Sequence, residues 1–257
     1  MSTRKWVILV VHAAAFVAAV GVAALDSSAA DWRPVELVLL LFFLAVGSDI
    51  LTVEVRGLRV SGAFLAIILA MTLLGPAPAV AIGVVSTMID GLRARRRWEG
   101  AVNDLVNYAV FPLVGGLLIE LLAGNGAPDG SGLGFAAAVL LVFMACNFLN
   151  FLMVVGFQAV YWGRPLRESV RSIYGAVLPS EFATGLLTAA VAYSYYLVGV
   201  AAVWLTAVVL FVFQYLLRAG LQAFERGEEL GKRTRELASL QVGLLSTVLQ
   251  TLSMRDG

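Results

Sequence analysis

The chain has 257 residues, of which 60% are apolar and only 14% are charged, and its mean hydropathy is +0.90. Soluble domains are about 45–50% apolar and about 25% charged, so this composition excludes a water-soluble globular protein and predicts an integral membrane protein. The net charge of +1 comes from basic residues segregated by loop, which gives no basis for nucleic-acid binding. The single cysteine, Cys146, excludes an intrachain disulfide, and no catalytic or metal motif predicts an enzyme or a cofactor.

The apolar runs predict an all-α, polytopic transmembrane bundle of about seven or eight spans, since each span needs about 20 mainly apolar residues. In chain order the spans are expected at Trp6–Leu25, Val35–Leu51, Val60–Leu74, Ala77–Leu92, Ala101–Ala123, Leu133–Tyr161, Ile173–Tyr196 and Val198–Leu217. The number of spans changes if Val60–Leu74 or Ile173–Tyr196 merges with a neighbour. Within the spans, Pro112 predicts a kink and Pro179 an interruption.

The basic residues assign the two sides of the membrane. Arg93, Arg95, Arg96 and Arg97 follow the fourth span, and Lys and Arg accumulate in short cytoplasmic loops. With this assignment only Arg33 of the 18 Lys and Arg residues lies outside. We therefore expect a multi-pass protein of a bacterial plasma (inner) membrane with both ends of the chain in the cytoplasm.

Residues 218–257 differ from the rest, because they are first charged and then amphipathic. Leu230, Leu237 and Leu244 recur every seven residues, a spacing typical of coiled coils. They predict a cytoplasmic signalling helix that pairs two chains into a homodimer. The alternative is an amphipathic helix on the membrane surface. Residues 1–217 then form the transmembrane sensor or ligand-binding domain.

Polar side chains inside apolar spans are costly and usually face the interior of the bundle. Glu181 follows a proline, and broken helices of this kind build ligand sites in transporters. The alternative is an acid neutralised by burial or paired with an arginine. Amides nearby either contact the ligand or bond to a neighbouring helix. The predicted ligand-binding residues are Glu181, Ser180, Asn147, Asn150 and Asn107.

A second polar group is interpreted as structural or coupling. It consists of residues at the predicted cytoplasmic ends of spans and on the face that Asn147 shares: Asp49, Asp90, Asn103, Asp104 and Gln158. The acids among them are expected to pair with arginines of the inside loops. The only histidine, His12, is a poor metal site by itself and is expected to pack or to bond between helices. The first span also carries alanines four residues apart, which favour close helix packing.

Two segments resemble known families. The segment LRVSGAFLAIILAMTLLGPAPAVAIGVVSTMIDGL resembles the helical pair in the S components of ECF-type vitamin transporters and in related membrane modules ahead of bacterial signalling domains. The tail RELASLQVGLLSTVLQTLSMRDG resembles the segment leading into HD-domain, HD-GYP-like phosphohydrolases, which cleave cyclic dinucleotides. None of that family's metal ligands is present in this chain, so no catalytic residue is carried over.

The resemblance implies the membrane half of a receptor. Such a module binds a small ligand or senses the membrane, and relays to a cytoplasmic HD-type cyclic-dinucleotide phosphohydrolase. The alternative implied by the first segment is an S-component-like substrate-binding subunit of a small-molecule transporter. Its weakness is the amphipathic tail, for which a transporter has no need.

Overall fold

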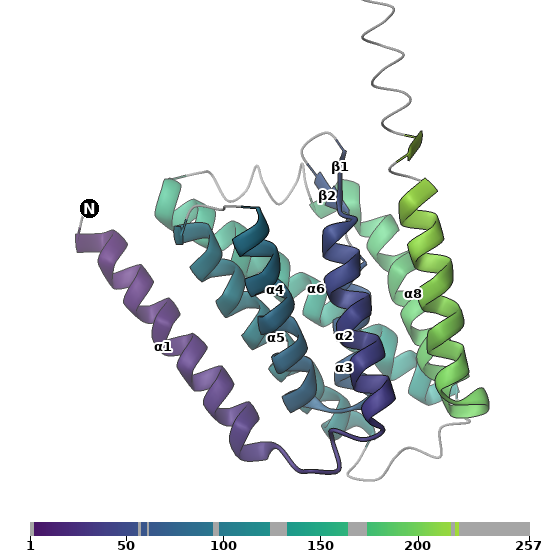
Figure 1. The fold of residues 1–257 in the computed structure, drawn as a ribbon. Helices are drawn as coiled ribbons and strands as arrows, with labels where there is room; N and C mark the ends of the chain where they lie inside the picture. The colour runs from purple at the N-terminus through teal and green to yellow at the C-terminus, as the bar shows by residue number, and fades with distance from the viewer. Residues whose placement is uncertain are drawn as a thin grey trace, which may run out of the picture. The chain divides into compact units, whose positions relative to one another are not determined.

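The described structure is helical apart from one short hairpin (Figure 1). A computed structural model describes residues 3–55, 58–60, 62–94, 98–123, 133–163, 174–216 and 219–220. The chain divides into two units, Met1–Phe211 and Val212–Gly257, and all the labelled helices and strands belong to the first. The elements in chain order are α1 (Thr3–Asp26), α2 (Val35–Ile50), β1 (Val53–Val55), β2 (Leu58–Val60), α3 (Ala63–Leu73), α4 (Pro76–Arg93), α5 (Trp98–Ala123), α6 (Leu133–Trp162), α8 (Gly175–Val198) and a further apolar helix, Val200–Leu216.

The helices lie where the apolar runs predict them, to within about one turn at either end. Gly75 and Gly199 follow α3 and α8 with positive φ angles of 94° and 71°, a region that favours glycine. The all-α prediction is confirmed for the fold class, and one short element was not predicted. Between α2 and α3, where a loop is predicted, β1 and β2 pair antiparallel, with Val53 opposite Val60. Valines at alternate positions suit a short strand better than a helix.

Helix α3 forms the centre of the main core instead of a full span. It contacts α2, α4, α5 and α8, and nearly all of its side chains are buried. Its Phe64 ring lies 5.0 Å from the ring of Phe111 on α5 and 5.3 Å from that of Phe143 on α6. With 11 residues it is about 16 Å long, about half the thickness of a bilayer's hydrocarbon core. The predicted third span, Val60–Leu74, is therefore too short to cross a membrane as a helix by itself.

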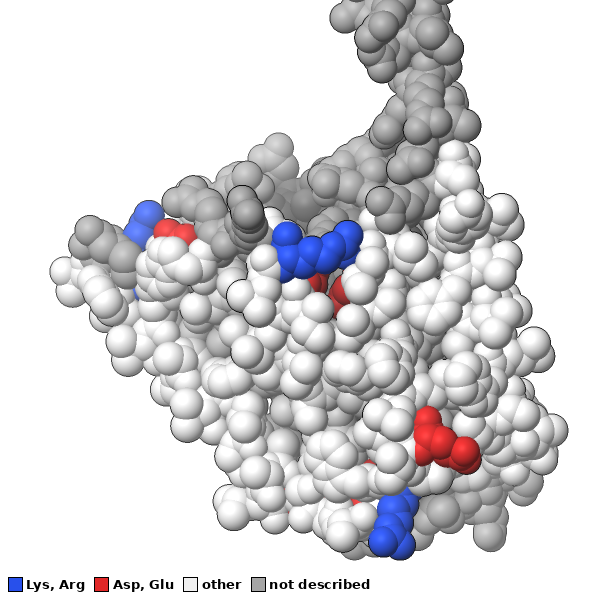
Figure 2. All heavy atoms as spheres, in the orientation of Figure 1, with Lys and Arg blue, Asp and Glu red and all other residues white. Residues whose placement is uncertain are grey.

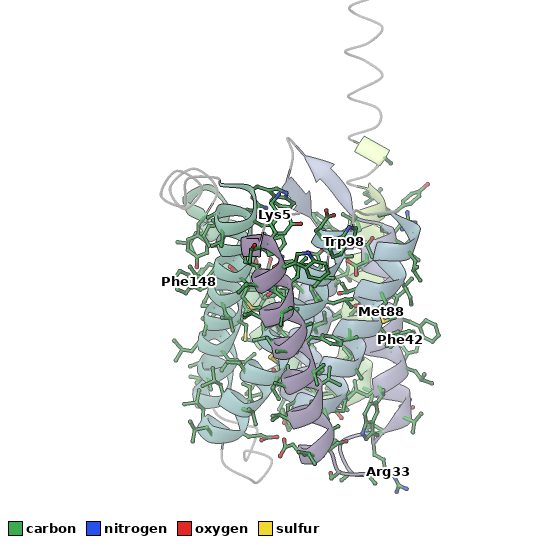
Figure 3. The ribbon with its side chains drawn as sticks, turned by 90° about the vertical axis from the view of Figure 1, so that its left-hand side faces the viewer. Lys5, Arg33, Phe42, Met88, Trp98 and Phe148 are labelled. Carbon is green, nitrogen blue, oxygen red and sulfur yellow. The ribbon has the colours of Figure 1, made fainter. Side chains whose placement is uncertain are left out.

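The outer surface of the helices is apolar. Leu25, Leu121 and Leu141 are 90%, 77% and 66% exposed, and soluble proteins rarely expose large side chains of this kind together. On the face drawn in Figure 2, charged atoms gather towards the two ends of the helices and the surface between them is uncharged. Phe148 and Met88 project outward on opposite sides in Figure 3.

Three of the described helices are long and apolar enough to cross a membrane. They are Lys5–Asp26, Trp98–Leu122 and Leu133–Trp162. Ala63–Leu73 and Val200–Leu216 are also apolar but shorter. These lengths and this apolar surface are compatible with a membrane-spanning helix bundle.

Helices α4 and α5 approach each other at two glycines, one on each helix. A Cβ on Gly83 would lie 2.6 Å from the backbone oxygen of Tyr108 on α5. A Cβ on Gly116 would lie 2.7 Å from the Cα and Cβ of Pro76 at the start of α4. Because these neighbours are mostly backbone atoms, only a residue without a side chain allows this approach.

Helix α1 packs on α4 and α5 through one of its two alanine rows. Ala19 and Ala23 are buried against Val80, Ala109 and Leu113, which is the close packing expected of small residues. The alanines of the other row, Ala14 and Ala18, are exposed.

Candidate functional site

Polar side chains from three helices meet inside the bundle. The Nδ2 of Asn147 on α6 donates a hydrogen bond to Oε2 of Glu181 on α8, over 2.7 Å. The Nδ2 of Asn107 on α5 donates to Oδ1 of Asn150 on α6. Because Asn147 and Asn150 are three residues apart, their side chains leave α6 in adjacent directions and reach different helices. We call these four residues the polar clamp.

The polar clamp lies within the apolar part of the bundle. Asn107 is 1% and Asn147 9% exposed, while Asn150 and Glu181 are partly buried. A polar group without a partner is costly in such surroundings, so the two bonds hold α5, α6 and α8 in one arrangement. Four of the five predicted ligand-binding residues are thus brought together as two interhelical pairs.

Two buried acceptors lie beside the polar clamp on α5. The Oδ1 atoms of Asn103 and Asn107 make no hydrogen bond within the described part of the chain. The two residues are four apart and therefore share a face of α5. Buried polar atoms nearly always find a partner, so this face of α5 retains capacity to accept hydrogen bonds from a donor-bearing molecule or water.

Ser180, the fifth predicted ligand residue, belongs to a different arrangement. It is exposed, and its backbone oxygen accepts a 2.9 Å hydrogen bond from Oγ1 of Thr184. Thr188 repeats this bond to the backbone oxygen of Thr184 over 2.8 Å. The expected interruption at Pro179 is wrong, because α8 runs without a break from Gly175 to Val198. The proline lies near the start of the helix, where few backbone bonds are lost.

The predicted coupling residues lie where the sequence places them, at helix ends or on α6. Asp49 and Asp90 are near the ends of α2 and α4, and Asp104 is near the start of α5. All three acids are partly buried and have interaction partners in the structure, as does Gln158. Their expected pairing with arginines stays a prediction, because most arginines of the inside loops, Arg56 and Arg95–Arg97 among them, fall outside the described residues.

Two cavities border α1, and the sequence indicated neither. One, of about 370 Å³, lies between α1, α5 and α6, and the other, of about 360 Å³, lies between α1 and α4. Both are lined almost wholly by hydrocarbon side chains. Such residues look alike in a sequence whether they face a cavity, a helix or lipid. The one available signal is His12, which lines the first cavity.

His12 makes a hydrogen bond within its own helix and an aromatic contact between helices. Its Nδ1 lies 2.9 Å from the backbone oxygen of Ile8, and its ring meets the edge of Phe157 on α6 at 5.1 Å. The expected packing contact is therefore present. Within the described ranges no group of three or more His, Cys, Asp or Glu side chains is arranged to hold a metal ion.

Among the described residues, the polar clamp and these two cavities are the candidate binding features. The clamp supplies carboxylate and amide groups, and the cavities supply apolar volume. Neither supplies an activated nucleophile or an acid–base pair set against a substrate position. Comparison with known proteins found no match to a family model, to a curated protein or to a solved structure.

Proposed function

We propose that the chain is the membrane-embedded sensory module of a bacterial receptor. In this proposal it binds a small ligand or senses the membrane, and relays to a cytoplasmic HD-type cyclic-dinucleotide phosphohydrolase. The observation that carries it is the polar clamp, which links three helices inside an otherwise apolar bundle. An inert anchor has no need of such groups, because intramembrane polar residues are costly to keep.

The clamp offers a way to convert binding into movement. A ligand with its own donor or acceptor competes for the bond between Asn147 and Glu181 or for that between Asn107 and Asn150. Each interhelical bond is worth only about 0.6 kcal/mol on average, so modest binding energy suffices to exchange it. Once a bond is exchanged, α6 and its neighbour are free to repack. In the proposal this change in helix packing is transmitted to residues 218–257 and from them to the output domain.

The proposed inside and outside assignment of the helix ends agrees with the helix ends that are neighbours in the structure. The ammonium of Lys5 lies 4.7 Å from the ring of Tyr161, so the start of α1 adjoins the end of α6. At the other end, Phe135 and Tyr196 are in ring contact at 5.0 Å, so the start of α6 adjoins the end of α8. Figure 3 has Lys5 and Arg33 at opposite ends of the bundle. The distribution of Lys and Arg in the sequence assigns the two helix ends of each of these pairs to the same side of the membrane.

Fusing a reporter after Gly257 tests this topology. Green fluorescent protein should fluoresce there, and alkaline phosphatase should be inactive, because the first works only in the cytoplasm and the second only in the periplasm. A fusion after Arg33 should behave in the opposite way. Phosphatase activity after Gly257 would place that end outside and contradict the route from clamp to output.

Cysteine cross-linking tests the expected homodimer. Leu237 and Leu244 lie outside the described residues, so their pairing rests on the seven-residue repeat. Cysteines at these positions, in a Cys146→Ala background, should form disulfide-linked dimers in membranes. Cysteines at Ser239 and Ser246, which fall outside the seam whether the leucines occupy a or d positions, are the matched control and should cross-link less. Equal or absent cross-linking at both pairs would remove the coiled-coil relay.

An S-component-like transporter subunit is the second candidate. The apolar hairpin of α3 and α4, turning at Gly75, and the exposed row of Ala14 and Ala18 favour it. It predicts co-purification of an energising ATPase and uptake of a labelled solute in cells. The sensor proposal predicts neither, and instead predicts altered cyclic-dinucleotide hydrolysis when the clamp is changed.

A further inference from the structure

The cavity between α1, α5 and α6 combines an apolar lining with one polar ring. Its walls include Val11, Ala15, Val106 and Phe157, and among the described residues His12 is the one polar side chain lining it. Its volume of about 370 Å³ falls within the range of about 300–1,000 Å³ typical of small-molecule sites. A charged ligand would lose its hydration there without compensation, so the cavity favours an uncharged one.

The hydrogen bond of His12 fixes what the imidazole can offer a ligand. A backbone oxygen can only accept, so the Nδ1 that lies 2.9 Å from the oxygen of Ile8 carries the proton. In the neutral ring the other nitrogen, Nε2, is then an acceptor and has no proton to donate. The ring is also held by its 5.1 Å edge contact with Phe157, which limits its rotation.

The cavity is open towards the surroundings of the bundle. Val7 and Val11, which form part of its wall, are 56% and 59% exposed. On the inner side Phe157 stacks on Tyr161, with ring centroids 5.0 Å apart and an angle of 12° between the ring planes. The Nζ of Lys5 lies 4.7 Å from the centroid of the Tyr161 ring. An apolar molecule can therefore enter sideways from the lipid. The ammonium of Lys5 lies over the tyrosine ring, and neither residue is among those that line the cavity.

We propose that this cavity binds an uncharged, lipid-soluble alcohol, whose hydroxyl donates a hydrogen bond to Nε2 of His12 and whose hydrocarbon part fills the space between α1, α5 and α6. The site is separate from the polar clamp. It goes beyond the sensor proposal and needs only that the chain is embedded in a membrane. A hydroxyl is favoured over an ether, ester or ketone because these lack the proton that Nε2 requires.

The test uses the full chain in nanodiscs of dioleoylphosphatidylcholine and tritiated probes, with binding read by scintillation proximity. 1-Decanol should bind about fivefold more tightly than 1-methoxydecane, the factor that one net hydrogen bond supplies. His12→Phe should abolish this preference and leave binding of the ether unchanged. His12→Gln, which restores an acceptor, should recover part of the preference.

Matched glycine variants locate the site. A Cβ on Gly156, which lines the cavity, would meet no atom within 4 Å, so the side chain of Gly156→Leu starts in open space and is chosen to occupy part of the cavity. It should lose both probes, whereas Gly134→Leu, in open space elsewhere on α6, should bind both normally. These binding measurements need neither the polar clamp nor an output domain, so a failure of the sensor proposal is distinguishable from a failure here. Equal binding of alcohol and ether by the unaltered chain, or unchanged binding by Gly156→Leu, would overturn the proposal. The proposal would also be overturned if decanoate bound more tightly than 1-decanol and 1-methoxydecane, and if His12→Phe did not change the binding of decanoate.

Discussion

Gly116→Ala should destabilise the bundle by about 1–3 kcal/mol, the usual cost of forcing an extra group into a packed interior. The added Cβ would lie 2.7 Å from two carbons of Pro76 and 2.9 Å from its backbone nitrogen. Backbone atoms cannot turn aside as the end of a long side chain can, so the start of α4 must move away from α5. The free energy of unfolding can be measured by tryptophan fluorescence as dodecyl sulfate is added to dodecyl maltoside micelles, since the chain has 5 tryptophans.

Gly21→Ala is the matched control for this experiment. Gly21 lies in the interior of α1, and a Cβ there would meet no atom within 4 Å. The same substitution should therefore stabilise by up to about 1 kcal/mol through helix propensity. Gly83→Ala, whose Cβ would lie 2.6 Å from the backbone oxygen of Tyr108, should behave like Gly116→Ala. If Gly116→Ala proved as stable as the control, the close contact of α4 and α5 would be wrong.

Asn147→Leu should cost about 1–3 kcal/mol of unfolding free energy, because it leaves the carboxyl group of Glu181 without its amide donor in an apolar bundle. The double variant Asn147→Leu/Glu181→Leu should recover part of this loss, since no unpaired polar group remains. The resulting coupling energy is expected between about 0.6 and 1.7 kcal/mol, the average and upper values for interhelical bonds in membrane proteins. The same micelle titration measures the unfolding free energy of the unaltered chain, of the two single variants and of the double variant.

Two further variants separate stability from signalling. Glu181→Gln keeps a hydrogen-bonding side chain and should be nearly as stable as the unaltered chain, yet it changes the bond to Asn147. Placed in a protein that carries its output domain, it should alter cyclic-dinucleotide hydrolysis if the clamp transmits a signal. If Glu181→Gln and Asn147→Leu both left hydrolysis unchanged, the chain would be an anchor that only localises and pairs its output.

The sequence by itself predicted a membrane protein and determined the placement of its helices. Apolar runs of sufficient length form helices whenever lipid or a packed interior replaces water, because a helix satisfies its own backbone hydrogen bonds. Pattern also singled out Asn107, Asn147, Asn150 and Glu181, since polar side chains are rare and costly in such runs. These conclusions need only local composition.

Only the tertiary structure decided which polar groups meet and which apolar faces leave space between them. The sequence placed Asn147 and Asn150 on one helical face, but not that one would reach α8 and the other α5. It also gave no means to distinguish α3, enclosed by four helices, from a span in contact with lipid. The physical reason is that leucine, valine and alanine suit lipid, a packed core and a cavity wall equally well. Their surroundings depend on neighbours that are distant in the chain.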